Sequence, residues 1–433
     1  MMPGMSARKH GFSPARRRAA AYPAAAAVVA VCCAVPAAVA AVADPDPIRL
    51  HPPEPTGPYS VGRADLHLVD ESRGHPWVEG AEKRDVPVSV WYPAEDTSGE
   101  RAPYMPDAVA EVMAGQVEQL GLPRDAVDFA GSDTDAFARA DAAPGAGKLP
   151  VVLYSHGFRQ SRHQATAQLE ELASSGYAAV AMDHPYETSA VELPGGRIVR
   201  DAAPGSGAEA LRTAVGVRVA DTRFVLDALE DIAEGRNPDA AGRALPRGLS
   251  GALDLSAVGM YGHSLGGLTV AEAVLADDRI DAGADLDGTI AYHVGEEEWA
   301  ESTVEGVDRP FLLMGGGVIG GSADPHTSGH APDWRMFRRA STGPFTELYL
   351  PDAEHMSFTD SQWILPQVGR RLELNGRKWE DAVTGSVGTV DPQRSVAAQR
   401  AYITAFFDRH LRGEGAPLLD GPSAEYPAVE FVG

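Results

Sequence analysis

Cysteine is nearly absent from this chain of 433 residues, which contains only Cys32 and Cys33. Both lie in an alanine-rich apolar run, residues 19–42, that follows three consecutive arginines at 16–18. A basic start, an apolar run and small residues at its end are typical of a cleaved signal peptide, here residues 1–43. We therefore expect a secreted protein whose mature chain has no cysteine.

A mature chain without cysteine excludes disulfides, thiol catalysis and metal sites built on cysteine. Pro23 and Pro36 interrupt the apolar run, which favours a cleaved signal over a membrane anchor. A lipid-anchored cysteine and twin-arginine export are the alternatives at this end of the chain. We expect no stable membrane insertion after cleavage.

Basic residues are also scarce, with 37 Lys and Arg against 61 Asp and Glu and a formal net charge of −24. The leader holds five basic residues and no acidic one, so the mature chain carries 32 against 61, a charge of −29. Such a surface repels nucleic acid and anionic membranes. The pair Asp277–Asp278 could bind calcium, but solvated loop charge is the simpler interpretation, and we expect no cofactor or metal.

Strand-like and helix-like segments alternate after a proline-rich extended linker at residues 44–58. Strands are expected at 59–69 (an edge strand), 86–92, 149–154, 177–182, 255–262, 280–286, 310–314 and 345–350. Helices are expected at 108–120, 163–174, 208–233, 268–276 and 396–411. This alternation, with continuously apolar strands, predicts an α/β fold in one domain, residues 59–433, with a mostly parallel sheet covered on both faces. Residues 94–147, a candidate insertion, and 188–207 are otherwise expected to be irregular.

The sequence Gly262-His263-Ser264-Leu265-Gly266 follows an apolar strand and precedes a helix. A strand that turns sharply into a helix places the middle residue on a strained corner, with its hydroxyl exposed above the sheet edge. Free N–H groups at the helix start can receive a developing oxyanion. We therefore predict Ser264 as a nucleophile.

A serine nucleophile requires a base, and the base requires an acid to orient it. In this architecture the chain order is serine, acid, histidine. His355 follows the last predicted strand and is the favoured base, with His326 and His330 as weaker candidates. For the acid, Asp287 is favoured over Asp324 and Asp285, both of which also follow or end a strand.

The oxyanion hole of such a site requires two backbone donors. One is expected from Leu265, which follows the nucleophile. The other is expected from Phe158 in Ser155-His156-Gly157-Phe158, directly after the strand at 149–154. A glycine at position 157 would allow the backbone to approach the substrate closely.

These motifs resemble the plasma, lipoprotein-associated platelet-activating factor acetylhydrolase family, a branch of the α/β hydrolases. The similar stretches are Gly57–Gly62, Val90–Pro93, Val151–Phe158, Gly262–Gly267, Leu286–Asp287 and His355–Asp360, the last matching a His-x-x-Phe-x-Asp motif. The resemblance implies an α/β-hydrolase fold, a triad of Ser264, Asp287 and His355, and oxyanion donors at Phe158 and Leu265.

The expected function is hydrolysis of short or oxidised acyl esters, including the sn-2 acyl group of phospholipids, through a Ser-His-Asp acyl-enzyme mechanism. The expected partner is therefore an ester or lipid substrate. A lipase or cutinase acting on triglycerides or polyesters would use the same residues. A binding protein on an inactive hydrolase fold is the alternative outside the enzymes.

Overall fold

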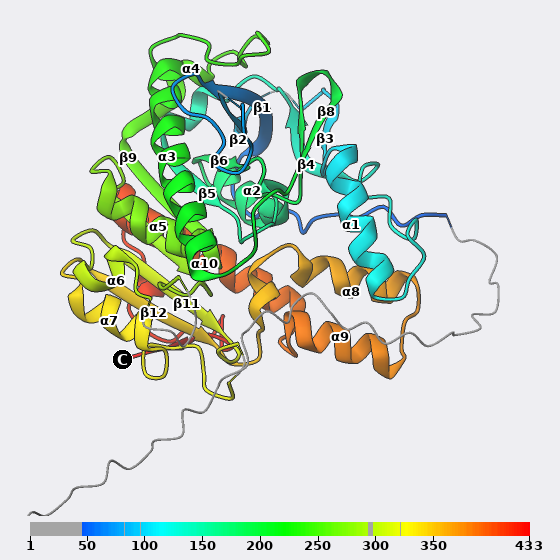
Figure 1. The fold of residues 1–433 in the computed structure, drawn as a ribbon, viewed down its shortest axis with the longest axis vertical. Coiled ribbons are helices and arrows are strands. Elements are labelled where there is room, and N and C mark those ends of the chain that lie inside the picture. Colours follow the sequence, from blue (N-terminus) through cyan, green and yellow to red (C-terminus); the bar gives the residue numbers. More distant parts are fainter. Residues whose placement is uncertain (1–45, 82, 96, 293–297, 321) are drawn as a thin grey trace, which may run out of the picture.

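A computed structural model describes residues 46–81, 83–95, 97–292, 298–320 and 322–433 (Figure 1). The predicted signal peptide lies outside these residues. Within them, eleven strands form one sheet in the order β13-β12-β11-β10-β9-β5-β6-β2-β1-β4-β3. The strands are β1 (Ser60–Asp70), β2 (Arg84–Ala94), β3 (Arg101–Pro103), β4 (Asp133–Ala138), β5 (Leu149–Ser155), β6 (Ala178–Met182), β9 (Leu253–His263), β10 (Ala282–Leu286), β11 (Phe311–Gly316), β12 (Phe345–Leu350) and β13 (Glu430–Phe431).

The six central strands, β6, β5 and β9 to β12, are parallel to their neighbours, whereas β2 and β13 pair antiparallel to the two ends of this block. The α-helices are α1 (Asp107–Gln119), α2 (Thr166–Ser174), α3 (Ala208–Ala233), α4 (Leu249–Ala252), α5 (Leu265–Ala276), α6 (Glu301–Glu305), α7 (Pro332–Ala340), α8 (Ser361–Arg371), α9 (Arg377–Val387) and α10 (Pro392–Leu411). The predicted α/β class with a mostly parallel sheet is confirmed.

Each central strand sends alternate side chains into two separate cores, because successive residues of a strand point to opposite faces. In β5, Val151 and Leu153 join a core with α3, α5 and α7, whereas Val152 and Tyr154 join one with α2 and α10. Both faces of the sheet are therefore covered by helices. This explains why the central strands read as continuous apolar runs rather than as alternating ones.

A third apolar cluster joins α1, α8 and the segment at residues 46–58, on one side of the molecule (Figure 1). This segment is extended, as expected for a proline-rich stretch, but it is packed against the domain. Ile48 and Leu50 are buried, and the Leu50 N–H donates to Ser132 Oγ at 2.8 Å. The predicted helix at 108–120 corresponds to α1 within this region.

Three local predictions are wrong. The strand at 59–69 is not an edge, since β1 lies between β2 and β4. The covering strands β3 and β4 are short and come from residues 94–147, where the sequence has no strong strand pattern. Residues 188–207, expected to be irregular, contain a hairpin of β7 (Ala190–Leu193) and β8 (Arg197–Arg200).

Among the described residues, no helix is both long enough and apolar enough to span a bilayer.

Candidate active site

Ser264 lies at the corner between β9 and α5, with φ 56° and ψ −123°. This left-handed φ is unfavourable for a residue with a side chain, and such strain is concentrated at functional sites. The corner requires its glycines. A Cβ on Gly262 would lie 2.3 Å from the backbone carbon of Gly266, and one on Gly266 would lie 1.9 Å from the Ser155 carbonyl oxygen.

His355 follows β12 and begins a short 3-10 helix, η4 (His355–Phe358). Its Nε2 lies 3.0 Å from Ser264 Oγ, and its Nδ1 lies 2.6 Å from Asp287 Oδ2. Because an ionised carboxylate only accepts hydrogen bonds, Nδ1 carries the hydrogen and Nε2 accepts from the serine hydroxyl. The His355 side chain is 45% exposed, so this end of the arrangement faces solvent.

Asp287 directly follows β10, with φ 57°, a conformation that aspartate tolerates better than most residues. Burial would raise its pKa, but His326 and His355 outweigh burial and hold the pKa well below its usual range. Of the three candidate acids, the structure brings only Asp287 to His355. Asp285 is buried with Oδ1 accepting from the Gly288 N–H at 2.8 Å, and Asp324 is exposed in the loop after β11.

These residues meet because they follow the carboxyl ends of neighbouring parallel strands. Ser264 follows β9, Asp287 follows β10 and His355 follows β12, while Phe158 follows β5 on the other side of β9. Parallel strands place all of these ends at one edge of the sheet. The topology thus assembles residues that are up to 197 positions apart in the chain.

Two backbone N–H groups, in the residues that follow β5 and β9, have no hydrogen-bond partner among the described residues. Leu265 is the first residue of α5, so no carbonyl of the helix precedes it for its N–H to reach. In the loop after β5, the N–H groups of Gly157, Arg159 and Gln160 make hydrogen bonds. The N–H of Phe158 makes none to any described residue, so both predicted oxyanion donors are available.

Arg218 of α3 holds the loop after β5 from behind. Its guanidinium donates to the carbonyl oxygens of His156 and Gly157 and pairs with Glu187. The carbonyl of Gly157 and the N–H of Phe158 belong to one trans peptide unit and point in opposite directions. By drawing that carbonyl inward, Arg218 turns the Phe158 N–H outward.

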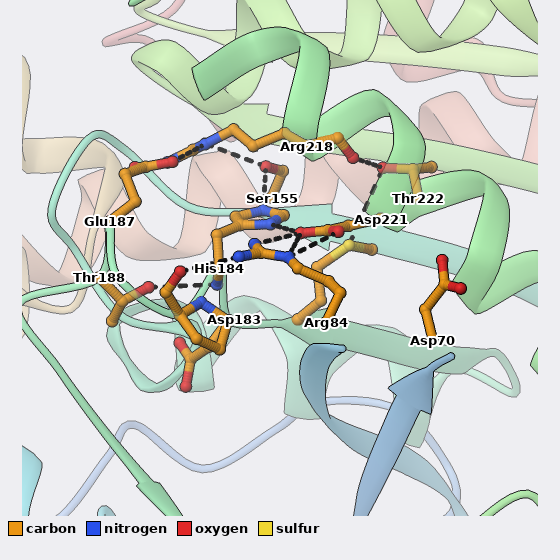
Figure 2. A network of polar contacts seen from close by, with 12 residues as sticks. Asp70, Arg84, Ser155, Asp183, His184, Glu187, Thr188, Arg218, Asp221 and Thr222 are labelled. Carbon is orange, nitrogen blue, oxygen red and sulfur yellow. Dashed lines mark hydrogen bonds and ion pairs between the residues drawn. The ribbon is translucent and has the colours of Figure 1, made fainter. Parts of the chain in front are cut away.

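Arg218 belongs to a fully buried polar network drawn in Figure 2. There Arg84 pairs with Asp221 at 2.6 Å, His184 Nδ1 donates to Asp221 at 2.9 Å, and Ser155 lies between His184 and Arg218. Sequence reasoning missed this network. Its signal was present, because Arg218 and Asp221 interrupt the apolar stripe of the helix at 208–233.

Of the two alternative bases, neither contacts Ser264. His330 is exposed and lies 3.2 Å from Thr327 Oγ1. His326 is buried, and its Nδ1 lies 2.8 Å from Asp287 Oδ1, the carboxylate oxygen that His355 does not use. Asp287 therefore contacts two histidines, an arrangement that no local sequence pattern predicts.

Comparisons with known proteins identify similar acetylhydrolases and esterases. Residues 49–194 match the family model for platelet-activating factor acetylhydrolase, isoform II. A probable 1-alkyl-2-acetylglycerophosphocholine esterase from Arthroderma benhamiae is 28% identical over 414 residues, covering 90% of this chain and 96% of that protein. The platelet-activating factor acetylhydrolase of Cavia porcellus is 27% identical over 57% of each chain.

Among solved structures, a ferulic acid esterase from Streptomyces cinnamoneus superposes with a TM-score of 0.68 at 34% identity. The match covers 88% of this chain and 99% of that one. The fold and these relatives define the chain as an α/β hydrolase of the carboxylic ester hydrolase class. Its resemblance to the platelet-activating factor acetylhydrolase family, predicted from its motifs, is confirmed by the family model over residues 49–194 and by these relatives.

Proposed function

We propose that this chain cleaves short or oxidised acyl esters, including the sn-2 acyl group of phospholipids, through an acyl-enzyme formed on Ser264. The observation that carries the proposal is the hydrogen-bond chain from Ser264 Oγ to His355 Nε2, 3.0 Å, and from His355 Nδ1 to Asp287 Oδ2, 2.6 Å. The serine of this chain lies at a strained corner, and the N–H groups of Phe158 and Leu265 have no partner among the described residues.

In the proposed reaction, Ser264 Oγ attacks the ester carbonyl while His355 Nε2 takes the hydroxyl proton. Asp287 keeps the hydrogen on Nδ1 and stabilises the imidazolium that forms. The N–H groups of Phe158 and Leu265 receive the oxyanion, and each such donor typically contributes ~3–4 kcal/mol to transition-state stabilisation. His355 then protonates the leaving alcohol, and a water activated by the same imidazole releases the acid.

Two acyl classes are supported by the relatives. The Arthroderma benhamiae relative is named as a probable esterase of 1-alkyl-2-acetylglycerophosphocholine, which favours a short acyl group. The Streptomyces cinnamoneus structure, 34% identical over nearly its whole length, is named for an aromatic acyl group. Hydrolysis of aromatic acyl esters is therefore the second candidate function.

The first experiment is the hydrolysis of p-nitrophenyl esters from acetyl to palmitoyl, with methyl ferulate as an aromatic ester. The wild type is compared with Ser264→Ala and with Ser256→Ala. The second variant is a control that removes an exposed serine hydroxyl near the start of β9, whereas Ser264 follows the end of that strand. We expect activity that peaks at two to four carbons, disappears with Ser264→Ala and is unchanged in Ser256→Ala.

The other outcomes select among the alternatives. A peak at eight or more carbons would favour the lipase or cutinase function, and preferential cleavage of methyl ferulate would favour the aromatic one. Activity that survives in Ser264→Ala would refute the mechanism. A folded wild-type protein that cleaves none of these esters would favour the inactive binding protein.

Secretion and domain organisation belong to the same proposal. The three arginines and the apolar run support export by a signal peptide of residues 1–43. The eleven-stranded sheet, which runs through the described residues, supports one catalytic domain at 59–433. The acidic surface argues against nucleic acid as a partner. Expression of the full chain in a secreting host should release protein whose mass corresponds to residues 44–433; protein retained with residues 1–43 attached would contradict export.

A further inference from the structure

Asp287 is shared by two imidazoles that lie in very different surroundings. Oδ2 accepts from His355, while Oδ1 accepts from His326 Nδ1 and from the Gly316 N–H, each at 2.8 Å. The His326 side chain is 6% exposed, against 45% for His355. One carboxylate thus joins a solvent-facing imidazole to a buried one.

The position of His326 is held on several sides. Its ring lies against Trp334 of α7, with centroids 4.3 Å apart and planes tilted by 30°. The Trp334 indole donates to the Gly288 carbonyl oxygen at 2.7 Å, next to Asp287. A Cβ on Gly315 would lie 2.1 Å from the His326 carbonyl oxygen, so β11 packs directly against this backbone. His326 therefore cannot easily leave the carboxylate.

The free ring nitrogen of His326 is a second indication of function. Nε2 is buried and has no hydrogen-bond partner among the described residues. A buried imidazole that served packing alone could be replaced by an apolar ring without leaving such an atom unsatisfied. Among the described residues, the polar contact that its side chain makes is the one with Asp287, and this contact gives the imidazole a role beside the acid.

Three acidic residues lie close enough to His326 to act on its charge. Asp287 and Asp285 come from β10 and its end, and Asp333 comes from α7. Beyond Asp287 lie His355 and Glu354, at the end of β12, and His263 of β9, whose ring centroid is 4.6 Å from that of His355. Burial lowers the pKa of His326, but the three carboxyl groups outweigh burial and raise it.

We propose that His326 is a positioning residue for ester hydrolysis, which orients Asp287 toward His355 and, when protonated, shares the carboxylate's charge and so makes His355 less basic. This rests on the proposed function, in which His355 is the base. A protonated His326 keeps His355 in its unprotonated, reactive form to lower pH than an unshared carboxylate would. The acid limb of the pH–rate profile reports this directly.

The test compares His326→Asn with His326→Leu on the p-nitrophenyl ester that the wild type cleaves best. Asparagine can donate a hydrogen bond to Asp287 but cannot become positively charged, and leucine can do neither. For His326→Asn we expect kcat within about tenfold of wild type and an acid limb of kcat/KM shifted upward by ~1 pH unit. For His326→Leu we expect kcat to fall by ~10–100-fold with KM nearly unchanged, because the carboxylate is no longer aligned.

His330→Asn, four residues away and exposed, is the matched control and should keep the wild-type profile. A His326→Asn profile that superimposes on the wild type would overturn the charge-sharing role. Wild-type kcat in both His326 variants would overturn the positioning role. If His326→Leu fails to fold, His326→Asn alone still decides the charge-sharing role.

Failure of the proposed function would look different. In that case Ser264→Ala would remain active, or a fluorophosphonate would not label Ser264 in the wild type. If labelling requires Ser264 and the His326→Asn profile is unshifted, the function stands and only the inference about His326 fails.

Discussion

Two hydrogen-bonded sets of serine, histidine and aspartate occur within the described residues. The exposed triad is Ser264, His355 and Asp287, and the buried triad is Ser155, His184 and Asp221. Their distances are similar: 3.0 and 2.6 Å in the exposed triad, 3.3 and 2.9 Å in the buried triad. The distances between these side chains therefore do not distinguish a reactive site from a structural network.

The surroundings of the two triads differ in three ways. Ser264 lies at a strained corner beside free N–H groups, whereas Ser155 is the last residue of a regular strand and its Oγ accepts from Arg218. Burial lowers the pKa of His184, which keeps this imidazole neutral. Arg84 forms an ion pair with Asp221, the acid of this triad. All three members of the buried triad are inaccessible to solvent. Solvent access and backbone strain at the serine therefore distinguish the exposed triad from the buried one.

The two serines should respond most differently to substitution. Ser264→Ala is expected to reduce kcat by ~10⁵–10⁶-fold with little change in stability. Ser155→Ala should reduce kcat less than tenfold but lower the free energy of unfolding by ~1–2 kcal/mol, because it removes a buried acceptor of Arg218. Ester hydrolysis and urea denaturation of both variants measure this. Similar losses of activity in the two would refute the distinction.

The two acids should separate activity from stability in the same way. Asp287→Asn no longer keeps the hydrogen on Nδ1 of His355 and should reduce kcat by ~10⁴-fold. Asp221→Asn leaves the fully buried Arg84 without its counter-charge and should destabilise the fold by ~3–5 kcal/mol. Thermal unfolding and kcat of the folded fraction test both. An Asp221→Asn protein as stable as the wild type would contradict the structural role of the buried triad.

Arg218 links the two regions, since it contacts Ser155 and also holds the Gly157 carbonyl. Lysine at this position keeps the charge but cannot serve both carbonyls and Glu187, because it lacks the planar fork of donors. We expect Arg218→Lys to lower kcat by ~10–100-fold with KM nearly unchanged, because the Phe158 N–H loses its orientation. A larger change in KM than in kcat would contradict this role.

Glu170 of α2 shows a buried carboxyl without the counter-ion that Asp221 has. It accepts from the Ala136 N–H at 2.9 Å, and its other oxygen has no partner among the described residues. Burial, reinforced by Asp135, raises its pKa to about 8. Between the unfolded pKa near 4.5 and 8, only the folded state retains the proton, so its contribution to stability is lost as pH rises.

Glu170→Gln removes this titration and keeps the acceptor for Ala136. The variant should match the wild type at pH 5 and exceed its stability by roughly 1–3 kcal/mol at pH 8. Urea denaturation at both pH values measures the difference. A stability gap that does not change with pH would mean that the carboxyl does not titrate in this window.

The predictable part of the fold and site depended on local signals. The residues adjacent to Ser264 predict the strand-to-helix corner, and the apolar runs of the central strands indicate burial on both faces. The helix at 208–233 was predicted at the bounds of α3 because apolar residues recur at helical spacing along most of its length, despite the interruption at Arg218 and Asp221. The β3–β4 edge, the β7–β8 hairpin and α9 escaped prediction, because short or polar elements form through contacts with the rest of the chain.

The sequence by itself determined the class of fold, the corner that presents Ser264 and the order in which serine, acid and histidine follow their strands. Only the tertiary structure decided that Asp287 rather than Asp285 or Asp324 reaches His355, that His326 occupies the other carboxylate oxygen, and that a second triad is buried behind the loop after β5. The physical reason is that strand periodicity and turns act between neighbours in the chain. The partner of a buried charge is chosen in space, from residues whose positions only the assembled sheet brings together.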